Sequence, residues 1–170
     1  MNKQFAAILV ALLVAAIPAT ATADDRFAAE TAAMAPVADA YFEAYIRLDW
    51  DHLEPLLADD ANFRDPTSAL VFGGVGAEGK AAMMRKFRTA YTSLRQMGFT
   101  KKRIIHSGNF ALYEGDLSWT VDMGDGRDVS SVTPIVIVLE VRGGKVVSHR
   151  DYVDYAPFLA AERATRPAKK

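Results

Sequence analysis

The sequence contains no cysteine, only three histidines and nearly balanced charge, and each feature excludes a class of function. Without cysteine the chain can form no disulfide and carry no lipidated N-terminal cysteine. The histidines at positions 52, 106 and 149 have no close paired spacing, so we expect no metal site. The 20 Lys and Arg residues are matched by 21 Asp and Glu residues, which predicts no binding to nucleic acid.

Motifs for nucleotides and for a nucleophilic serine are also missing. Residues 74–81, GVGAEGKA, have the spacing of a phosphate loop, but Ala81 replaces the hydroxyl that would hold magnesium. No G-x-S-x-G sequence is present. We therefore expect no cofactor.

The sequence lacks an apolar run long enough to cross a bilayer, which takes about 20 residues. The shorter run 5–17 follows Lys3 and precedes the small-x-small triplet 21–23, a pattern typical of a cleaved export signal. We predict a signal peptide over residues 1–23 and a periplasmic or secreted protein. No membrane anchor is expected after cleavage.

Residues 24–160 have the usual length of one domain and are enough to build a hydrophobic core. Residues 161–170 include the basic cluster 163–170 and are expected to form a flexible, solvated tail. No internal repeat appears after the predicted signal peptide.

The spacing of apolar residues predicts helices in the first half of the chain. Residues 37–48 contain one apolar stripe of an amphipathic helix. Asp51 and Glu54 have capping-box spacing and predict a short second helix. A third helix is expected from the stripe between residues 84 and 94, after a glycine-rich loop at the rim of a pocket, residues 73–79.

The second half of the chain has the character of strands. One short strand is also predicted in the first half, where it carries Phe63 and Asp65 and is ended by Pro66. Four long strands parted by glycine-rich turns are predicted at residues 99–106, 109–121, 128–141 and 145–153. Helices followed by an antiparallel meander favour the α+β class.

Two long stretches carry a family resemblance. YFEAYIRLDWDHLEPLLADDANFRDP, residues 41–66, resembles the opening of the nuclear transport factor two-like, or SnoaL-like, superfamily and is closest to its ketosteroid isomerases. TPIVIVLEVRGGKVVSHRDYVDY, residues 133–155, resembles the ending of both the isomerases and the limonene epoxide hydrolases. The resemblance implies a conical α+β barrel, with N-terminal helices packed on a strongly curved, mainly antiparallel sheet. It also implies a pocket for a hydrophobic small molecule and a homodimer formed through the sheet.

The resemblance also assigns roles to particular residues. Asp65 stands where the isomerases keep their general base, and Tyr41 stands where they keep a tyrosine that donates to the developing oxyanion. Val136 stands in place of their second oxyanion donor. Asp151 stands where the hydrolases keep an acid, whereas Phe63 and Asp65 replace polar residues that hold their water. Neither known site is complete in this sequence.

Strand alternation groups the candidates into one constellation. It places Val147, His149, Asp151 and Val153 on one face, where the two acids would share a desolvated cavity. The candidate catalytic residues are Asp65, Tyr41, Asp151 and His149, and the candidate substrate-binding residues are Phe63, Trp119, Val136 and Phe87.

Each catalytic candidate also has a purely structural interpretation. Asp65 before a proline is ordinary turn chemistry, and Tyr41 and His149 could be hydrogen-bonded core residues. Asp151 could instead pair with Arg103 or Arg150. The sequence therefore leaves open an enzyme using acid/base chemistry at Asp65, by isomerisation, cyclisation or hydrolysis, and a non-catalytic ligand-binding or dimerisation module.

Overall fold

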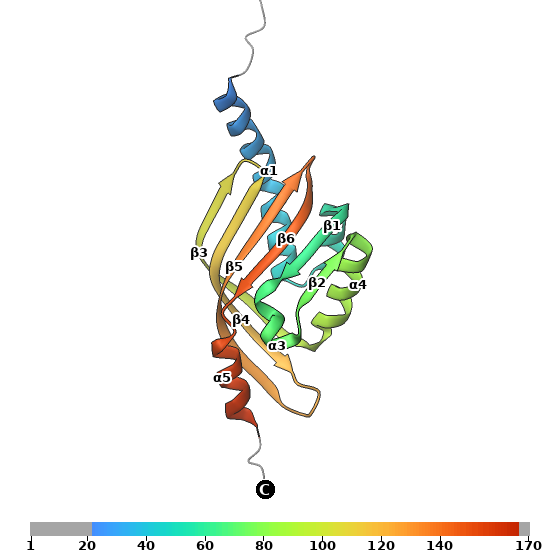
Figure 1. The fold of residues 1–170 in the computed structure, drawn as a ribbon, viewed down its shortest axis with the longest axis vertical. Coiled ribbons are helices and arrows are strands. Elements are labelled where there is room, and N and C mark those ends of the chain that lie inside the picture. The colour runs from blue at the N-terminus through green and yellow to red at the C-terminus, as the bar shows by residue number, and fades with distance from the viewer. Residues whose placement is uncertain (1–21, 167–170) are drawn as a thin grey trace, which may run out of the picture.

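The computed structural model describes residues 22–166, so most of the predicted signal peptide lies outside the described residues. The helices are α1 (Ala23–Ile46), α2 (Trp50–Leu53), α3 (Ala69–Phe72), α4 (Lys80–Ala90) and α5 (Ala156–Thr165). The strands are β1 (Leu57–Asp65), β2 (Val75–Glu78), β3 (Leu94–Ser107), β4 (Phe110–Asp122), β5 (Asp128–Arg142) and β6 (Lys145–Val153). Figure 1 shows α1 behind the sheet, with its first turns projecting beyond the strands, and α5 at the opposite end of the molecule.

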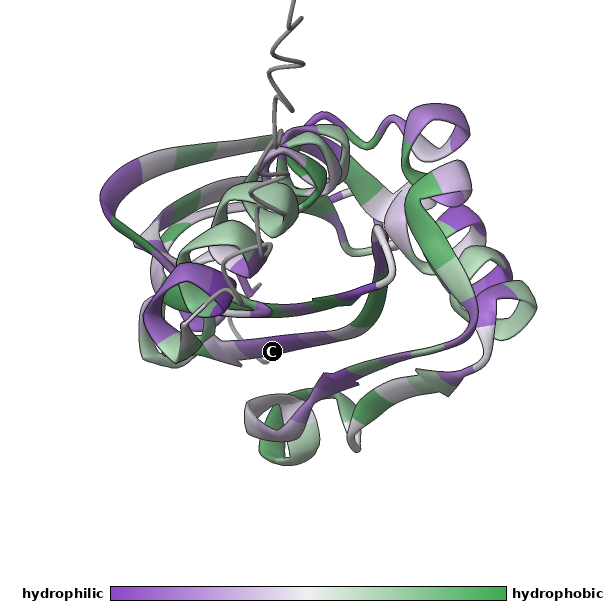
Figure 2. Ribbon diagram, turned by 90° about the horizontal axis from the view of Figure 1, so that it is seen from above, coloured by the Kyte–Doolittle hydropathy of each residue, from purple (hydrophilic) through white to green (hydrophobic). Residues whose placement is uncertain are grey.

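The strands form one sheet in the order β2-β1-β6-β5-β4-β3. Strands β1 and β6 are parallel, and every other neighbouring pair is antiparallel. Figure 2 shows how strongly the sheet curls, although its two edge strands do not meet. The predicted α+β class and the curved, mainly antiparallel sheet are confirmed, and the four long strands lie where the sequence predicts them.

The hydrophobic core lies between the concave face of the sheet and helices α1 and α4. Alternate residues of β4 face inward, and Tyr113 among them stacks on Phe42 of α1 with 4.0 Å between ring centroids. Burying one such side chain contributes roughly 1.5–3 kcal/mol. This packing fixes α1 across the sheet, where its next turn reaches the candidate site.

Helix α1 is longer than its apolar stripe predicts. It begins at Ala23, where Thr22 and Asp25 form a capping box. The turns before residue 34 are largely exposed and alanine-rich, so helix propensity and the cap extend the helix without an apolar face. The C-terminal end comes earlier than predicted, because Leu48 lies in the left-handed region with φ of 56°.

Helix α2 is capped two residues earlier than the sequence predicts. Asp49, and not Asp51, accepts a hydrogen bond from the backbone N–H of His52. Asp51 lies inside the helix, and its carboxylate pairs with Arg88 of α4. Aspartates at both positions fit the sequence pattern, and only the position of the helix start separates them.

The segment predicted as a glycine-rich loop contains strand β2. Its residues pair antiparallel with β1, and Phe63 lies opposite Ala77. Four residues are too few to give a periodic signal, and the flanking glycines at 73, 74 and 79 have positive φ. The strand covers the edge of β1 beside the candidate site.

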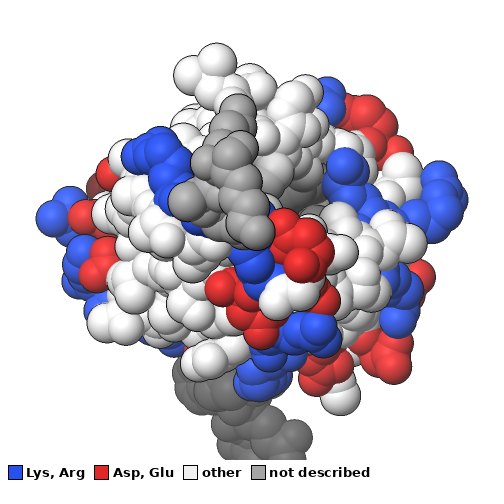
Figure 3. Space-filling model, turned by 90° about the horizontal axis from the view of Figure 1, so that it is seen from below, with Lys and Arg blue, Asp and Glu red and all other residues white. Residues whose placement is uncertain are grey.

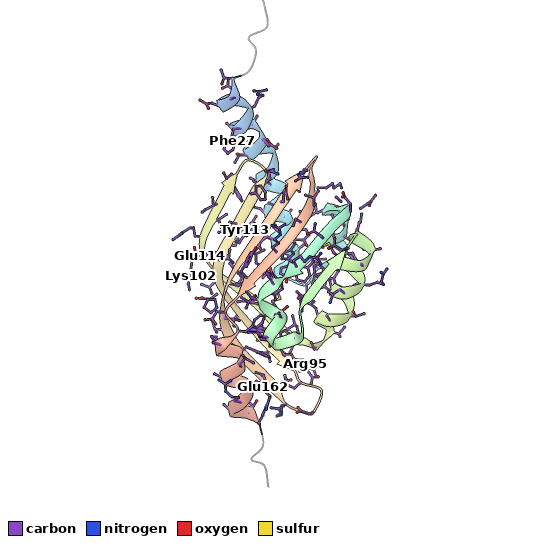
Figure 4. The ribbon with its side chains drawn as sticks, viewed as in Figure 1. Phe27, Arg95, Lys102, Tyr113, Glu114 and Glu162 are labelled. Atoms are coloured by element: carbon purple, nitrogen blue, oxygen red, sulfur yellow. The ribbon has the colours of Figure 1, made fainter. Side chains whose placement is uncertain are left out.

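The C-terminal segment is ordered further than the expected tail allows. Residues 161–165 complete helix α5, whereas 167–170 lie outside the described residues. The Glu162 side chain is buried and binds Arg166 at 2.6 Å and Arg127 at 3.7 Å. Figure 4 places Glu162 at the end of the molecule opposite Phe27 of α1.

The described surface carries both signs of charge. On the face seen in Figure 3, acidic and basic side chains are interspersed. Within residues 22–166, no helix combines the length and apolar character that a membrane span requires.

Candidate functional site

Two buried carboxylates lie side by side on the concave face, where β1 and β6 run as parallel neighbours. Phe63 of β1 pairs with His149 of β6, so the same register two residues later brings Asp65 beside Asp151. All four side chains face inward. Only 5% of Asp65 and 4% of Asp151 are exposed. Neighbouring strands are about 4.8 Å apart, so the two acids share one small region.

A β-bulge sets which residues of β6 face inward. Val141 pairs with Val146 while Glu140 pairs with Ser148, which leaves Val147 as an extra residue. The predicted inward position of Val147 is therefore wrong, and Val146 is buried instead. Beyond the bulge, the predicted alternation of β6 is correct.

Asp65 serves the turn that the sequence suggested. Its Oδ1 accepts hydrogen bonds from Thr67 Oγ1 at 2.6 Å and from the backbone N–H of Ser68 at 3.0 Å. These bonds cap the short helix at 66–68. Its other oxygen, Oδ2, accepts a hydrogen bond from the Tyr155 hydroxyl at 2.5 Å. The turn occupies one oxygen, and a tyrosine from beyond β6 holds the other.

Asp151 is the centre of a chain of buried side chains. Its Oδ1 lies 2.8 Å from His149 Nε2, and its Oδ2 lies 3.1 Å from the Tyr45 hydroxyl. The Tyr41 hydroxyl lies 3.0 Å from His149 Nδ1, and the Tyr91 hydroxyl lies 2.5 Å from the Tyr45 hydroxyl, so both tyrosines extend this hydrogen-bonded chain. Helix α1 supplies two of these tyrosines from successive turns.

The partners fix the direction of each hydrogen bond. Tyr41 is fully buried, and its hydroxyl has one partner, so it donates to Nδ1 and leaves the ring proton of His149 on Nε2. The Nε2–H group of His149 and the hydroxyl of Tyr45 each donate a hydrogen bond to Asp151. Tyr91 must then donate to Tyr45. Every proton in the chain points toward the Asp151 carboxylate.

Burial keeps these tyrosines protonated. Desolvation, reinforced by the Asp151 charge, raises the pKa of Tyr41 and of Tyr45 well above 10. The pKa of Tyr91 is raised by the same two causes, and that of Tyr155 by burial and then by its hydrogen bond to Asp65. The hydroxyl donors to both carboxylates therefore persist at neutral pH.

Both carboxylates line a cavity of about 320 Å³. This volume lies within the usual range for small-molecule sites, roughly 300–1,000 Å³. The walls are mainly apolar, and six aromatic residues contribute to them: Tyr45, Phe63, Phe72, Tyr91, Trp119 and Tyr155. The partly exposed Lys86 of α4 also lines the cavity. The arrangement offers an apolar molecule two acidic groups on one wall.

Half of the predicted site residues line this cavity. Asp65, Asp151, Phe63 and Trp119 do so. Tyr41 and His149 lie behind the wall, where they hold Asp151 and are not among the lining residues. The structural interpretation of these two as hydrogen-bonded core residues matches their position.

The other two predicted binding residues do not reach the cavity. Phe87 is fully buried in the core, stacked on Trp50 at 5.3 Å between ring centroids. Val136 faces the outer side of the sheet, and its neighbour Ile135 lines the cavity instead. A one-residue error in register moves a strand residue to the opposite face. The inward residue is apolar as well, so no second oxyanion donor is gained.

Three tyrosines of the site are not among the residues that the sequence predicted. Tyr45 lies one turn after Tyr41 on the predicted helix, and Tyr91 lies on the stripe of the third helix, so helical spacing could have identified both. Tyr155 follows the last strand and has no periodic signal.

Within residues 22–166, neither carboxylate forms an ion pair with Lys or Arg. Arg103, which the sequence offered as a partner of Asp151, pairs with Glu114. The ion pair of Asp151 is with His149, and it is charged on both sides only if the histidine is protonated. No group of three or more acidic or histidine side chains in this part of the chain could hold a metal ion.

Comparison with known proteins agrees with this geometry. The SnoaL-like domain family matches residues 38–149, which is more than half of the chain, and the protein therefore belongs to this family. The predicted family resemblance is confirmed. No curated protein sequence matches the chain significantly.

Solved structures share the fold at low sequence identity. A Shewanella denitrificans protein described as a SnoaL-like polyketide cyclase has a TM-score of 0.69 at 14% identity, covering 78% of this chain and 98% of that one. A phenazine biosynthesis-related protein from Pseudomonas aeruginosa has a TM-score of 0.69 at 13% identity, covering 91% and 94%. An LEH-like epoxide hydrolase from M. tuberculosis has a TM-score of 0.60 at 20% identity, covering 78% and 90%.

Proposed function

We propose that this protein binds a small, mainly apolar molecule in the aromatic cavity and transfers protons on it with Asp65 and Asp151. The observation that carries the proposal is the placement of two buried carboxylates on adjacent strands at the wall of one apolar cavity. Two acids in such a space repel each other, and a proton moving between ligand and protein relieves that repulsion. The reaction class is isomerisation, cyclisation or hydrolysis by acid/base chemistry.

The residues around Asp151 support a distinction between catalytic and positioning residues. Asp151 accepts hydrogen bonds from His149 and from Tyr45, and the Tyr45 hydroxyl accepts one from Tyr91. Tyr91 also lines the cavity. A hydrogen-bonded chain of this kind holds the carboxylate in one orientation. His149 and Tyr41 therefore act as positioning residues in the proposal, and Asp65 and Asp151 as the catalytic ones.

The test is proton exchange on a simple apolar ketone. In deuterated water, NMR follows loss of the protons beside the carbonyl of phenylacetone, and hydration of styrene oxide is followed in parallel. We expect wild-type protein to accelerate at least one reaction, and Asp65→Asn or Asp151→Asn to slow it roughly 100-fold or more, because general acid/base catalysis contributes on the order of 10²–10⁴.

Asp60→Asn is the matched control, since Asp60 lies on the same strand β1 but is exposed. It should leave both rates unchanged. Wild-type rates in both active-site variants, or no acceleration by the wild-type protein, would overturn proton transfer and leave a non-catalytic ligand-binding site.

A second proposal is that two copies pair through the outer face of the sheet. Exposed apolar side chains gather on that face, with Ile105 on β3, Val132 on β5 and Tyr152 on β6 among them. An apolar sheet face of this kind is stabilised when a second surface covers it. A second copy provides a self-complementary partner under twofold symmetry.

A further inference from the structure

We propose that the molecule bound in the cavity carries a positively charged nitrogen, as a tertiary or quaternary ammonium group on an apolar body. This inference rests on the proposed function because it concerns the ligand of the same cavity. It does not depend on turnover.

The first observation is that two buried acids lack a Lys or Arg partner among the described residues. Asp65 and Asp151 are buried neighbours, and the described residues provide neither of them with a Lys or Arg partner within ion-pair distance. Lys86 is the basic residue among those lining the cavity, and it forms no ion pair with either acid. A buried charge without a partner is costly, and a second like charge beside it adds repulsion. A cation in the cavity relieves both costs.

The second observation concerns what the carboxylates can still accept. Asp65 accepts three hydrogen bonds and Asp151 accepts two. A carboxylate has about four acceptor positions, so roughly three remain on the pair, spread over three oxygen atoms. A primary ammonium needs three acceptors close together to replace its water. A tertiary ammonium has one N–H and a quaternary ammonium has none, so neither needs more than one of these acceptor positions.

The third observation is the nature of the other walls. Trp119 and the tyrosines at 45, 91 and 155 line the same cavity as the two acids. Aromatic rings attract weakly hydrated cations through the negative potential of their faces, and tryptophan is the best of them. Aromatic walls combined with carboxylates recognise an alkylated ammonium, whereas a neutral apolar ligand would use only the walls.

The test compares two molecules of the same shape that differ in charge. Benzyltrimethylammonium and neopentylbenzene are isosteric, with a positively charged nitrogen in the first where the second has carbon. Both are titrated into wild-type protein, and the shift of the Trp119 indole N–H signal is followed by NMR. We expect the cation to bind at least tenfold more tightly than the neutral compound.

Variants then test whether the two acids cause the preference for the cation. Asp65→Asn and Asp151→Asn should each reduce affinity for the cation at least tenfold and change affinity for neopentylbenzene no more than about twofold. Asp60→Asn, on the exposed part of β1, should change neither. Because the wild-type comparison needs no variant, the test holds even if one substitution prevents folding.

The outcomes separate this inference from the proposed function. Equal or tighter binding of neopentylbenzene would overturn the charge preference and leave an apolar binding cavity intact. Binding of neither compound would overturn both proposals. Preferential binding of the cation by a protein that exchanges no ketone protons would support the ligand class while removing the catalytic proposal.

Discussion

Asp65 shows that a turn residue and a cavity residue can be the same side chain. Its Oδ1 caps the short helix at 66–68, and its Oδ2 is held by Tyr155 at the cavity wall. Aspartate before proline was expected to do one or the other. The carboxylate has two oxygens, and the fold uses them for different purposes.

The sequence identified the two acids but not most of the residues that contact them. Asp65 and Asp151 were selected through the family resemblance, and strand alternation placed Asp151 on the inward face. The contacts of their partners could not be predicted, since Tyr155 binds Asp65 from 90 positions away and Tyr91 binds Tyr45 from 46 positions away. Contacts between distant segments leave no pattern in one sequence.

The buried tyrosines predict a loss of stability at alkaline pH. The folded-state pKa of Tyr41 and of Tyr45 lies above the ordinary value of 10.0. Above about pH 10 the unfolded chain releases protons that the folded chain retains, so stability is full below that pH and falls as pH rises. Each tyrosine should contribute a slope of about 1.4 kcal/mol per pH unit.

Urea unfolding between pH 8 and 11 measures this slope. Tyr41→Phe should lower stability at pH 8 by roughly 1–3 kcal/mol, because His149 Nδ1 loses its donor, and should flatten the alkaline slope. Tyr152→Phe, at an exposed position, is the control. An alkaline slope that Tyr41→Phe does not reduce would contradict the assignment.

At the scale of elements, α5 packs behind a wall of the cavity. Phe158 in its first turn stacks on Trp119 with 4.8 Å between ring centroids, and Tyr155 at its N-terminus holds Asp65. The helix is held at its other end by Glu162. Hydrogen bonding to Arg166, and then the charge of Arg127, lowers the pKa of Glu162.

Glu162→Gln should therefore loosen α5. The lowered pKa means that this carboxylate stabilises the folded helix above the ordinary value of 4.5, and the contribution is lost as pH falls. Amide hydrogen exchange in residues 156–165 should be several-fold faster in the variant at pH 7. Glu30→Gln, on the exposed turns of α1, should leave that exchange unchanged. Equal protection in both variants would show that Phe158 alone secures the helix.

The elements that the sequence predicted are those with a strong period. The four long strands and the stripe of α4 repeat often enough to be recognised. Strand β2 and the first turns of α1 were missed, because one is four residues long and the other has no apolar face. Both depend on backbone hydrogen bonds that side-chain pattern does not report.

At the scale of the whole molecule, the outer face of the sheet predicts self-association. Val132, in the first half of β5, is 58% exposed. Val132→Glu should convert a dimer at micromolar concentration into a monomer, because a charge would be buried without a partner. Light scattering coupled to size exclusion measures this mass. Thr92→Glu, exposed beyond the sheet, is the control, and a wild-type monomer would refute pairing through this face.

The overall class and family could be predicted from sequence because they depend on element order and on long motifs. The resemblance implied the strong curvature and a pocket, but the open sheet edges and most of the residues that line the cavity could not be predicted, since they follow from how bulges and helix packing bend the sheet. Position 136 illustrates the limit, because an apolar residue was found at the right level of the strand but on the wrong face.

The bulge at Val147 has a consequence for how such a site evolves. It lets Val146 and His149 both face inward although they are three positions apart. Loss of the single codon for Val147 would leave every proposed functional residue in the gene. The strand would then be regular, and alternation would still place both Val146 and His149 on the inward face. Loss of one residue at the bulge would therefore keep the proposed site, whereas loss of the residue between His149 and Asp151 would turn one of these two outward.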